Sequence, residues 1–227
     1  MKIIIIGLGN FGSSLAQKLT LLGHEVIGVD HQMAKVENLK ESISHTVCMN
    51  CADQHAAEYL PLKDTDLVIV AIGEDQGSNI LVTALMKQLK VKRLISRAIS
   101  PLHQTILEAI EVDDIVHPEQ ESAERWAKKI NTLGVIDSFD LAGEYSIVEA
   151  IVPSQFIGKN LKDSGIRKKY NVIVLTTITV TKGGNLFGMF RKKLAVQGIA
   201  TPETVLEKDD ILVLFGHNKD IQRLLQQ

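Results

Sequence analysis

The chain has 227 residues, of which 45% are hydrophobic and 23% charged, and its formal net charge is −2. This length allows one large domain or two small ones, and the near-neutral charge excludes a general polyanion binder. No apolar run approaches the roughly 20 residues that span a membrane, and early glycines argue against a signal peptide. With two cysteines, we expect a protein of the reducing cytoplasm.

Short apolar runs alternate with helical patterns in the first part of the chain. The runs predict strands at 2–6, 25–29, 45–49, 66–71, 93–97 and 114–116. Leucine spacing predicts helices at 13–22 and 78–89, and a proline followed by acidic residues predicts a helix at 118–130. Near-continuous Ile and Val is typical of parallel strands buried on both faces. The expected fold is therefore α/β, with a Rossmann-like doubly wound parallel sheet.

The pattern changes near residues 138–144, where Asp140 and Gly143 lie in a stretch without a helical period. Beyond it we expect strands at 145–152, 171–181 and 211–215, a short helix near 159–169 and a last helix from about Lys219. This arrangement predicts two domains, a nucleotide-binding domain at 1–140 and a small α+β domain at 141–227.

The stretch Gly7-x-Gly9-x-x-Gly12 matches the dinucleotide-binding fingerprint, and it lies between a predicted strand and a predicted helix. The helix N-terminus there offers free N–H groups to an anion. Asp30 ends the second strand, where a carboxylate accepts hydrogen bonds from ribose hydroxyls. We expect Asp30→Ala to weaken ribose-containing ligands and to leave the fold intact. The alternative is that the glycines only pack strand against helix and that Asp30 caps the next helix.

Three more polar residues follow predicted strands. Arg97 lies at the carboxyl edge of the sheet, where ligands bind in such folds, and is either a phosphate contact or a surface or interface arginine. Asp53 is either near the adenosine or an N-cap of the following helix. His117 precedes Pro118, where a helix start explains the segment without catalysis, because no nucleophile or paired base is nearby; metal binding or a subunit contact is the alternative.

Two other features have a structural and a functional interpretation. Cys48-x-x-Cys51, with His45 and His55 close by, suggests zinc or redox chemistry, but zinc needs further ligands, and we favour small buried residues at a strand end. Residues 159–202 contain nine Lys or Arg and one acidic residue, which indicates either a solvated face or an anion or docking site. Few aromatic residues lie among them, so nucleic-acid stacking is not expected.

Six stretches spread over nearly the whole chain carry a family resemblance. They are IIGLGNFGSSLAQKLTLLGHEVIGVD (5–30), LVIVAIGED (67–75), DDIVHPE (113–119), EYSIVEAIVP (144–153), IGKNLKDSGIRKKY (157–170) and LEKDDILVLFGHNKDIQRL (206–224). The chain resembles the cytoplasmic regulatory subunits of bacterial Trk/Ktr-type potassium uptake systems, TrkA/KtrA-like proteins with an RCK (KTN) N-terminal domain and an RCK C-terminal domain. A plain dehydrogenase would not carry the second half of this set.

The resemblance implies a nucleotide site and a cation site. In it, Gly7, Gly9 and Gly12 line the phosphates, Asp30 holds the ribose, and Arg97 stands at the position of a phosphate-contacting lysine. The remaining residues that it places at the nucleotide are Asn10, Phe11, Asp53, Ala71 and Gly73. Glu119 matches an acidic residue that the family uses around a divalent cation at the subunit interface. The implied ligand is NAD(H) or an adenine nucleotide (AMP, ADP or ATP), and cyclic di-AMP is a further candidate for the C-terminal domain, with Arg167 in the matching segment.

Two departures from the family pattern affect these expectations. ATP-responsive members often have arginine after the second glycine, whereas this chain has Asn10, which weakens ATP-versus-ADP sensing. The segment 184–197 is longer than the usual hairpin, and is either a bland extension or a contact with a partner or membrane surface.

The implied function is a regulatory subunit, not an enzyme, that gates a TrkH/KtrB-like potassium transporter. It would act at the inner face of the membrane as a homo-oligomer, a dimer assembled into an octameric ring, without nucleic acid. The main alternative is an NAD-dependent oxidoreductase, for which the sequence offers no acid–base pair and only a small second domain. A transcriptional sensor would need a helix-turn-helix segment with a basic recognition helix, and the sequence shows none.

Overall fold

The computed structural model describes residues 1–131, 134–141, 143–182 and 192–226. The chain forms two compact units, Met1–Glu121 and Ser122–Gln227, and each is described by itself. The units divide before the expected boundary at 140/141, because residues 135–140 form a strand that pairs within the second sheet. The limits 1–140 and 141–227 stay a prediction about the domains of the family.

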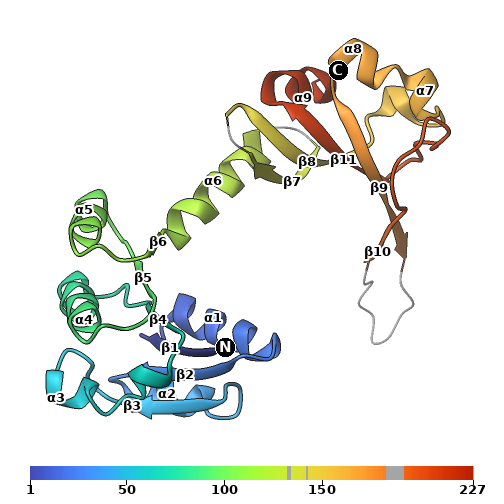
Figure 1. The fold of residues 1–227 in the computed structure, drawn as a ribbon. Coiled ribbons are helices and arrows are strands. Elements are labelled where there is room, and N and C mark those ends of the chain that lie inside the picture. The colour runs from blue at the N-terminus through green and yellow to red at the C-terminus, as the bar shows by residue number, and fades with distance from the viewer. Residues whose placement is uncertain (132–133, 142, 183–191, 227) are drawn as a thin grey trace. The chain divides into compact units, whose positions relative to one another are not determined.

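The first unit is built on one parallel sheet (Figure 1). Its strands are β1 (Lys2–Ile6), β2 (Glu25–Asp30), β3 (His45–Cys48), β4 (Leu67–Val70), β5 (Leu94–Arg97) and β6 (Asp114–Val116). They pair in the order β3-β2-β1-β4-β5-β6, which is the doubly wound order that reverses direction at β1. The predicted α/β Rossmann-like fold is confirmed.

Helices connect these strands and cover both faces of the sheet (Figure 1). They are α1 (Asn10–Leu21), α2 (Met33–Leu39), α3 (Gln54–Ala57), the 3₁₀ turn η1 (Leu62–Asp64), α4 (Gln76–Gln88) and α5 (Pro101–Ala109). The helix α6 (Pro118–Asn131) follows β6, and the division between the two units falls within it. Side chains of β1 alternate between the faces: Ile3 and Ile5 pack with α1 and α2, whereas Ile4 and Ile6 pack with α3 and α4. All four are at most 2% exposed, and each contributes roughly 1.5–3 kcal/mol of burial free energy.

The second unit contains an antiparallel sheet in the order β10-β9-β11-β8-β7. Its elements are β7 (Val135–Asp140), β8 (Tyr145–Ile151), η2 (Ser154–Phe156), α7 (Leu161–Ser164), α8 (Ile166–Tyr170), β9 (Ile173–Lys182), β10 (Lys192–Val196), β11 (Ile211–His217) and α9 (Asn218–Leu225). Tyr170, Leu212 and Leu224 belong to one buried cluster, so the helices cover one face of the sheet. The expected α+β character of this unit is confirmed.

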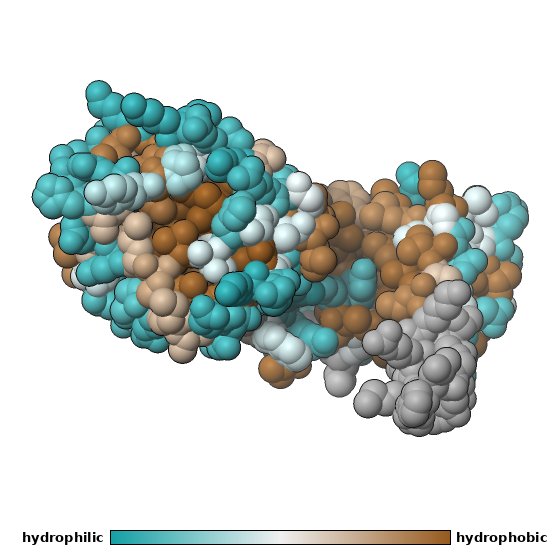
Figure 2. All heavy atoms as spheres, turned by 90° about the horizontal axis from the view of Figure 1, so that it is seen from below, coloured by the Kyte–Doolittle hydropathy of each residue, from teal (hydrophilic) through white to brown (hydrophobic). Residues whose placement is uncertain are grey.

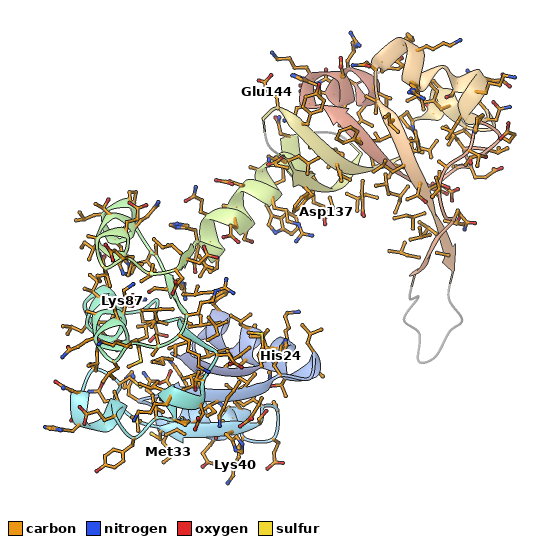
Figure 3. All side chains as sticks on the ribbon, viewed as in Figure 1. His24, Met33, Lys40, Lys87, Asp137 and Glu144 are labelled. Carbon is orange, nitrogen blue, oxygen red and sulfur yellow. The ribbon has the colours of Figure 1, made fainter. Side chains whose placement is uncertain are left out.

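One expectation about this unit needs correction. The single helix expected at 159–169 is two short helices, because Gly165 between them adopts φ 66°, in the left-handed region. The stretch at 138–144, expected only to have no helical period, contains the end of β7. Arg125 on α6 donates from Nε to Asp137 Oδ1 on β7 at 2.7 Å, and this bond lowers the pKa of Asp137. Asp137 is labelled in Figure 3.

The surface carries exposed apolar residues on both units (Figure 2). Trp126 on α6 is 57% exposed, Phe139 on β7 67% and Ile199 91%. No helix among the described residues is long and apolar enough to cross a membrane. Most of the segment expected at 184–197 lies outside the described residues, and so does part of the basic segment 159–202.

Candidate functional site

The glycine-rich turn after β1 is shaped by contacts within the protein. Gly7 has φ 98°, and a Cβ there would lie 2.9 Å from the backbone nitrogen of Ile72. A Cβ on Gly12 would overlap the carbonyl oxygen of Gly7. Folding alone therefore requires two of the three glycines, the first for its backbone conformation and the third for close packing of α1 on β1.

Gly9 is different, because the protein's own packing does not require it. It is the N-cap of α1, with φ −68°, which any residue adopts. Among the described residues beyond its neighbours in the chain, a Cβ there would meet one atom within 4 Å, Glu74 Oε1 at 4.0 Å. The missing side chain leaves room beside the N-terminus of a 12-residue helix, whose backbone N–H groups and dipole attract an anion. This geometry favours phosphate binding over the interpretation that the glycines only pack strand against helix.

A cavity of about 510 Å³ lies at the carboxyl ends of the central strands. Nine of the predicted site residues line it: Gly7, Gly9, Asn10, Phe11, Asp30, Ala71, Gly73, Arg97 and Glu119. Gly12 is absent from the lining because it packs α1 against the turn. Asp53 is also absent, and its Oδ1 instead accepts hydrogen bonds from the backbone N–H groups of His55 and Ala56 as the N-cap of α3. An adenosine role for Asp53 stays a prediction.

Asp30 is both a lining residue and a structural one. Its side chain is 4% exposed. Oδ2 accepts a hydrogen bond from the Leu8 backbone N–H at 2.8 Å, and Oδ1 accepts one from the Gln32 N–H at 2.9 Å. The carboxylate thus ties the glycine-rich turn to the end of β2. Since each carboxylate oxygen has two lone-pair sites, Asp30 keeps acceptor capacity toward the cavity.

Arg97 lies against the cavity wall and is only 13% exposed, so it is not a free surface arginine. Its guanidinium carbon lies 5.8 Å from the Phe11 ring centroid, and NH2 pairs with the carboxylate of Glu119. Its Nε is buried and has no hydrogen-bond partner among the described residues. A Cβ on Gly73 would overlap the guanidinium, so Gly73 makes space for Arg97.

Glu119 lies in the first turn of α6 and brings a carboxylate to the cavity. Within the described ranges of the chain, no three His, Cys, Asp or Glu side chains gather as a metal site. A cation at Glu119 would therefore need ligands from a bound nucleotide or a second subunit. At the start of α6, the backbone N–H of His117 donates to Glu121 Oε1 at 3.3 Å.

The sequence reasoning missed three charged residues that line the cavity, Lys35 on α2 and Glu74 and Asp75 after β4. Two of them form an ion pair, with Lys35 Nζ 3.2 Å from Glu74 Oε1. Glu74 is part of the LVIVAIGED stretch, yet nothing in that motif pairs it with Lys35. The signal that could have found Lys35 is its position just after Asp30, on the helix that follows the second strand.

The two cysteines occupy different environments. Cys51 is buried and lines the cavity, whereas Cys48 is exposed, and both are free thiols. The expectation that both are small buried residues is thus wrong for Cys48, because it lies at the exposed end of the edge strand β3. Burial raises the pKa of the Cys51 thiol to about 12, which keeps it protonated and unreactive at neutral pH.

A buried polar network lies behind the cavity wall. Asn79 Nδ2 donates to the carbonyl oxygens of Ile72 and Arg97 at 2.8 and 3.1 Å. Asn79 Oδ1 lies 3.1 Å from His103 Nε2, and the Ile99 backbone N–H donates to His103 Nδ1. These partners fix the neutral imidazole with its proton on Nε2, and desolvation lowers the pKa of His103. The network holds the strand ends that carry Gly73 and Arg97.

The parallel sheet, the glycine-rich turn and the acidic residue at the end of β2 define a dinucleotide-binding type of α/β domain, followed by an α+β unit. The TrkA-N domain family matches residues 3–118. The chain is 35% identical to Ktr system potassium uptake protein C of Bacillus subtilis (strain 168), over 96% of this chain and 93% of that protein. The chain therefore belongs to the TrkA-N family and, along nearly its whole length, to the Ktr potassium uptake proteins.

Solved structures support the fold. The GsuK RCK domain superposes with a TM-score of 0.65 at 20% identity, covering 100% of this chain and 48% of that one. The GsuK channel bound to NAD gives a TM-score of 0.62 at 21% identity, covering 98% of this chain and 38% of that one. This chain thus spans less than half of these neighbours, and the likeness concerns the fold.

Proposed function

We propose that this protein is the nucleotide-binding regulatory subunit of a Ktr/Trk-type potassium uptake system and gates a membrane transporter subunit. The observation that carries the proposal is the similarity to a Ktr potassium uptake protein over both units of the chain, together with a cavity at the turn after β1. An oxidoreductase is less supported, because the curated relative is a potassium uptake protein. We therefore propose binding without a chemical reaction.

The proposed ligand is NAD(H) or an adenine nucleotide. Gly9 leaves room for phosphate beside the helix N-terminus, and Asp30 has lone pairs left for ribose hydroxyls. The fold is similar to that of a channel solved with NAD. Binding would gate the transporter only through a difference in ligand affinity between two conformations, typically ~1–3 kcal/mol of coupling.

The proposal includes assembly and location. The subunit would form a homo-oligomer, a dimer within an octameric ring, on the cytoplasmic side of a TrkH/KtrB-like transporter. A divalent cation would bind at Glu119 between subunits, with further ligands from the nucleotide or the neighbouring chain. Cyclic di-AMP is kept as a ligand to be tested on the C-terminal unit.

The test is a thermal-shift panel with NADH, NAD, AMP, ADP, ATP and cyclic di-AMP, followed by potassium flux through the reconstituted transporter. A ligand at 100 times its Kd stabilises the native state by about 2.7 kcal/mol, so the true ligand raises the unfolding temperature with the logarithm of its concentration and changes the flux. Light scattering should show at least a dimer. Absence of any nucleotide effect on stability or flux would contradict the proposal, and NADH turnover with a small substrate would favour the oxidoreductase.

A further inference from the structure

The carboxylate of Glu74 lies beside the glycine-rich turn. Its Oε1 is 4.0 Å from the position where a Cβ on Gly9 would stand, and among the described residues, apart from the two neighbours of Gly9 in the chain, no other atom lies within that distance. This is the space that the missing Gly9 side chain leaves open. A negatively charged group of the protein itself thus lies beside the space where the backbone N–H groups at the start of α1 would attract a phosphate.

Lys35 holds Glu74 in that place. The Lys35 ammonium lies 3.2 Å from Glu74 Oε1, and the same oxygen faces the open space at Gly9. The side chain of Lys35 is 25% exposed, whereas that of Glu74 is 74% exposed. Glu74 can therefore swing into solvent, while Lys35 is largely covered by the protein and stays at the cavity.

The charges of the lining explain why this exchange matters. Besides Asp30, the described lining of the cavity has the acidic residues Glu74, Asp75 and Glu119 and the two cations Lys35 and Arg97, of which Arg97 is already paired with Glu119. Asp75 is occupied as the N-cap of α4, where it accepts a hydrogen bond from the Gly77 N–H at 2.9 Å. An anionic ligand therefore needs a cation that is released from its carboxylate partner. The Lys35–Glu74 pair is more exposed than the Arg97–Glu119 pair, so it is the easier one to break.

We propose that Glu74 occupies the phosphate position of the ligand-free cavity and that Lys35 exchanges its carboxylate for a phosphate of the bound nucleotide. This inference rests on the proposed nucleotide-binding function and adds to it a phosphate-contacting residue and an internal competitor. Lys35 acts as a phosphate contact. Glu74 pairs with Lys35 in the ligand-free protein, and this competition lowers the affinity for the nucleotide.

The test is calorimetric titration of ADP, and of adenosine as a ligand without phosphate, into wild type, Glu74→Gln, Lys35→Gln and the double variant. Loss of the competing carboxylate should tighten ADP binding about threefold to tenfold, and loss of the Lys35 charge should weaken it about tenfold. In the double variant, the gain from Glu74→Gln should largely disappear, because it depends on Lys35. Adenosine affinity should be the same in all four proteins.

The matched control is Glu25→Gln, which removes a similar ion pair with Lys2 at 3.3 Å. Glu25 begins β2, at the opposite end of the strand from the cavity, so ADP affinity should not change. Unchanged ADP affinity in both Glu74→Gln and Lys35→Gln, with wild type binding ADP, would overturn the inference and leave the proposed function standing. Additive effects in the double variant would show that the two residues act separately and would also overturn it. If the wild type binds neither ADP nor any other nucleotide, this result contradicts the proposed function as well.

Discussion

The glycine-rich turn and the ion pairs around the cavity are parts of one site, but different forces hold them. At the turn, Asp30 is buried and binds two backbone N–H groups, and Gly12 is in tight contact with the backbone of Gly7. At the cavity mouth, Lys35 with Glu74 and Arg97 with Glu119 are pairs in which the acidic partner is largely exposed.

The contacts at the turn are fixed by folding, whereas the ion pairs at the cavity mouth can be rearranged by a ligand. Backbone contacts at the turn exist whenever the domain is folded, and their loss appears as a loss of stability. An exposed ion pair contributes about 0–1 kcal/mol, so a phosphate can replace its carboxylate at little cost. Substitutions at the packed residues of the turn, Gly12 and Asp30, should therefore mainly change unfolding, whereas substitutions at Gly9 and at the ion pairs should mainly change binding.

Gly12→Ala should have the largest effect. The added methyl group overlaps the Gly7 carbonyl oxygen, and relief requires moving the backbone of β1 or α1, which should cost about 3 kcal/mol or more. Urea unfolding followed by circular dichroism measures this loss. Gly9→Ala is the matched control, because its methyl group meets no protein atom closer than 4.0 Å.

Gly9→Ala should change stability by at most about 1 kcal/mol but weaken ADP binding at least tenfold, about 1.4 kcal/mol, since the methyl group fills the phosphate space. Similar loss of stability in both glycine variants would contradict the distinction between a packing glycine and a ligand glycine.

Asp30→Ala should destabilise the protein by about 2 kcal/mol, because it leaves the buried Leu8 N–H without an acceptor. The structure thus changes the expectation that this substitution leaves the fold intact, since the carboxylate is part of the folded turn. Asp30→Asn keeps one acceptor oxygen, so its free energy of unfolding should fall by about half as much. Equal unfolding free energies for wild type and Asp30→Ala would show that the two backbone bonds are replaced by water.

Substitution of Asn10 tests whether the site distinguishes ATP from ADP by the γ-phosphate. Without a cation at this position, and with Arg97 paired with Glu119, ATP should bind no more than about tenfold tighter than ADP, ~1.4 kcal/mol. Asn10→Arg should shift the preference toward ATP, because charge-assisted hydrogen bonds are stronger than neutral ones. Titration of both nucleotides at one Mg²⁺ concentration measures the ratio. A hundredfold ATP preference in wild type would mean that another residue reads the γ-phosphate.

His103 should give the smallest effect, seen only in the pH dependence of stability. Its pKa is lowered in the folded state by burial, so the unfolded chain binds its proton more readily. Stability should therefore be complete above the unfolded pKa of about 6.5 and fall as the pH decreases below it. The measurement is the difference in unfolding free energy between pH 7.5 and 5.5 for wild type and His103→Gln. An equal pH dependence in the two proteins would assign the titration to other histidines.

The sequence by itself determined the first sheet and the centre of the site. The apolar runs predicted the parallel strands, most clearly the central strands β1 and β4, because strands buried on both faces need a continuous series of Ile, Val and Leu. Spacing gave Gly7, Gly9, Gly12 and Asp30, since a tight turn and a close helix restrict which residues fit at these positions. Local chemistry also signals α5, where Ser100 accepts from the His103 N–H and Pro101 begins the helix, although the leucine-based pattern did not include it.

Only the tertiary structure decided which charges meet. Lys35 and Glu74 are 39 positions apart, and Arg97 and Glu119 are 22 apart. They come together because the strand order brings the loops after several strands to one edge of the sheet. The strand β7 was also not predicted from the sequence, since its half-buried residues, such as Ser138, show no clear alternation of buried and exposed side chains. They form a strand by pairing with β8. Periodicity reports which side of an element is buried, whereas a pairing of exposed charges depends on where distant loops end in space.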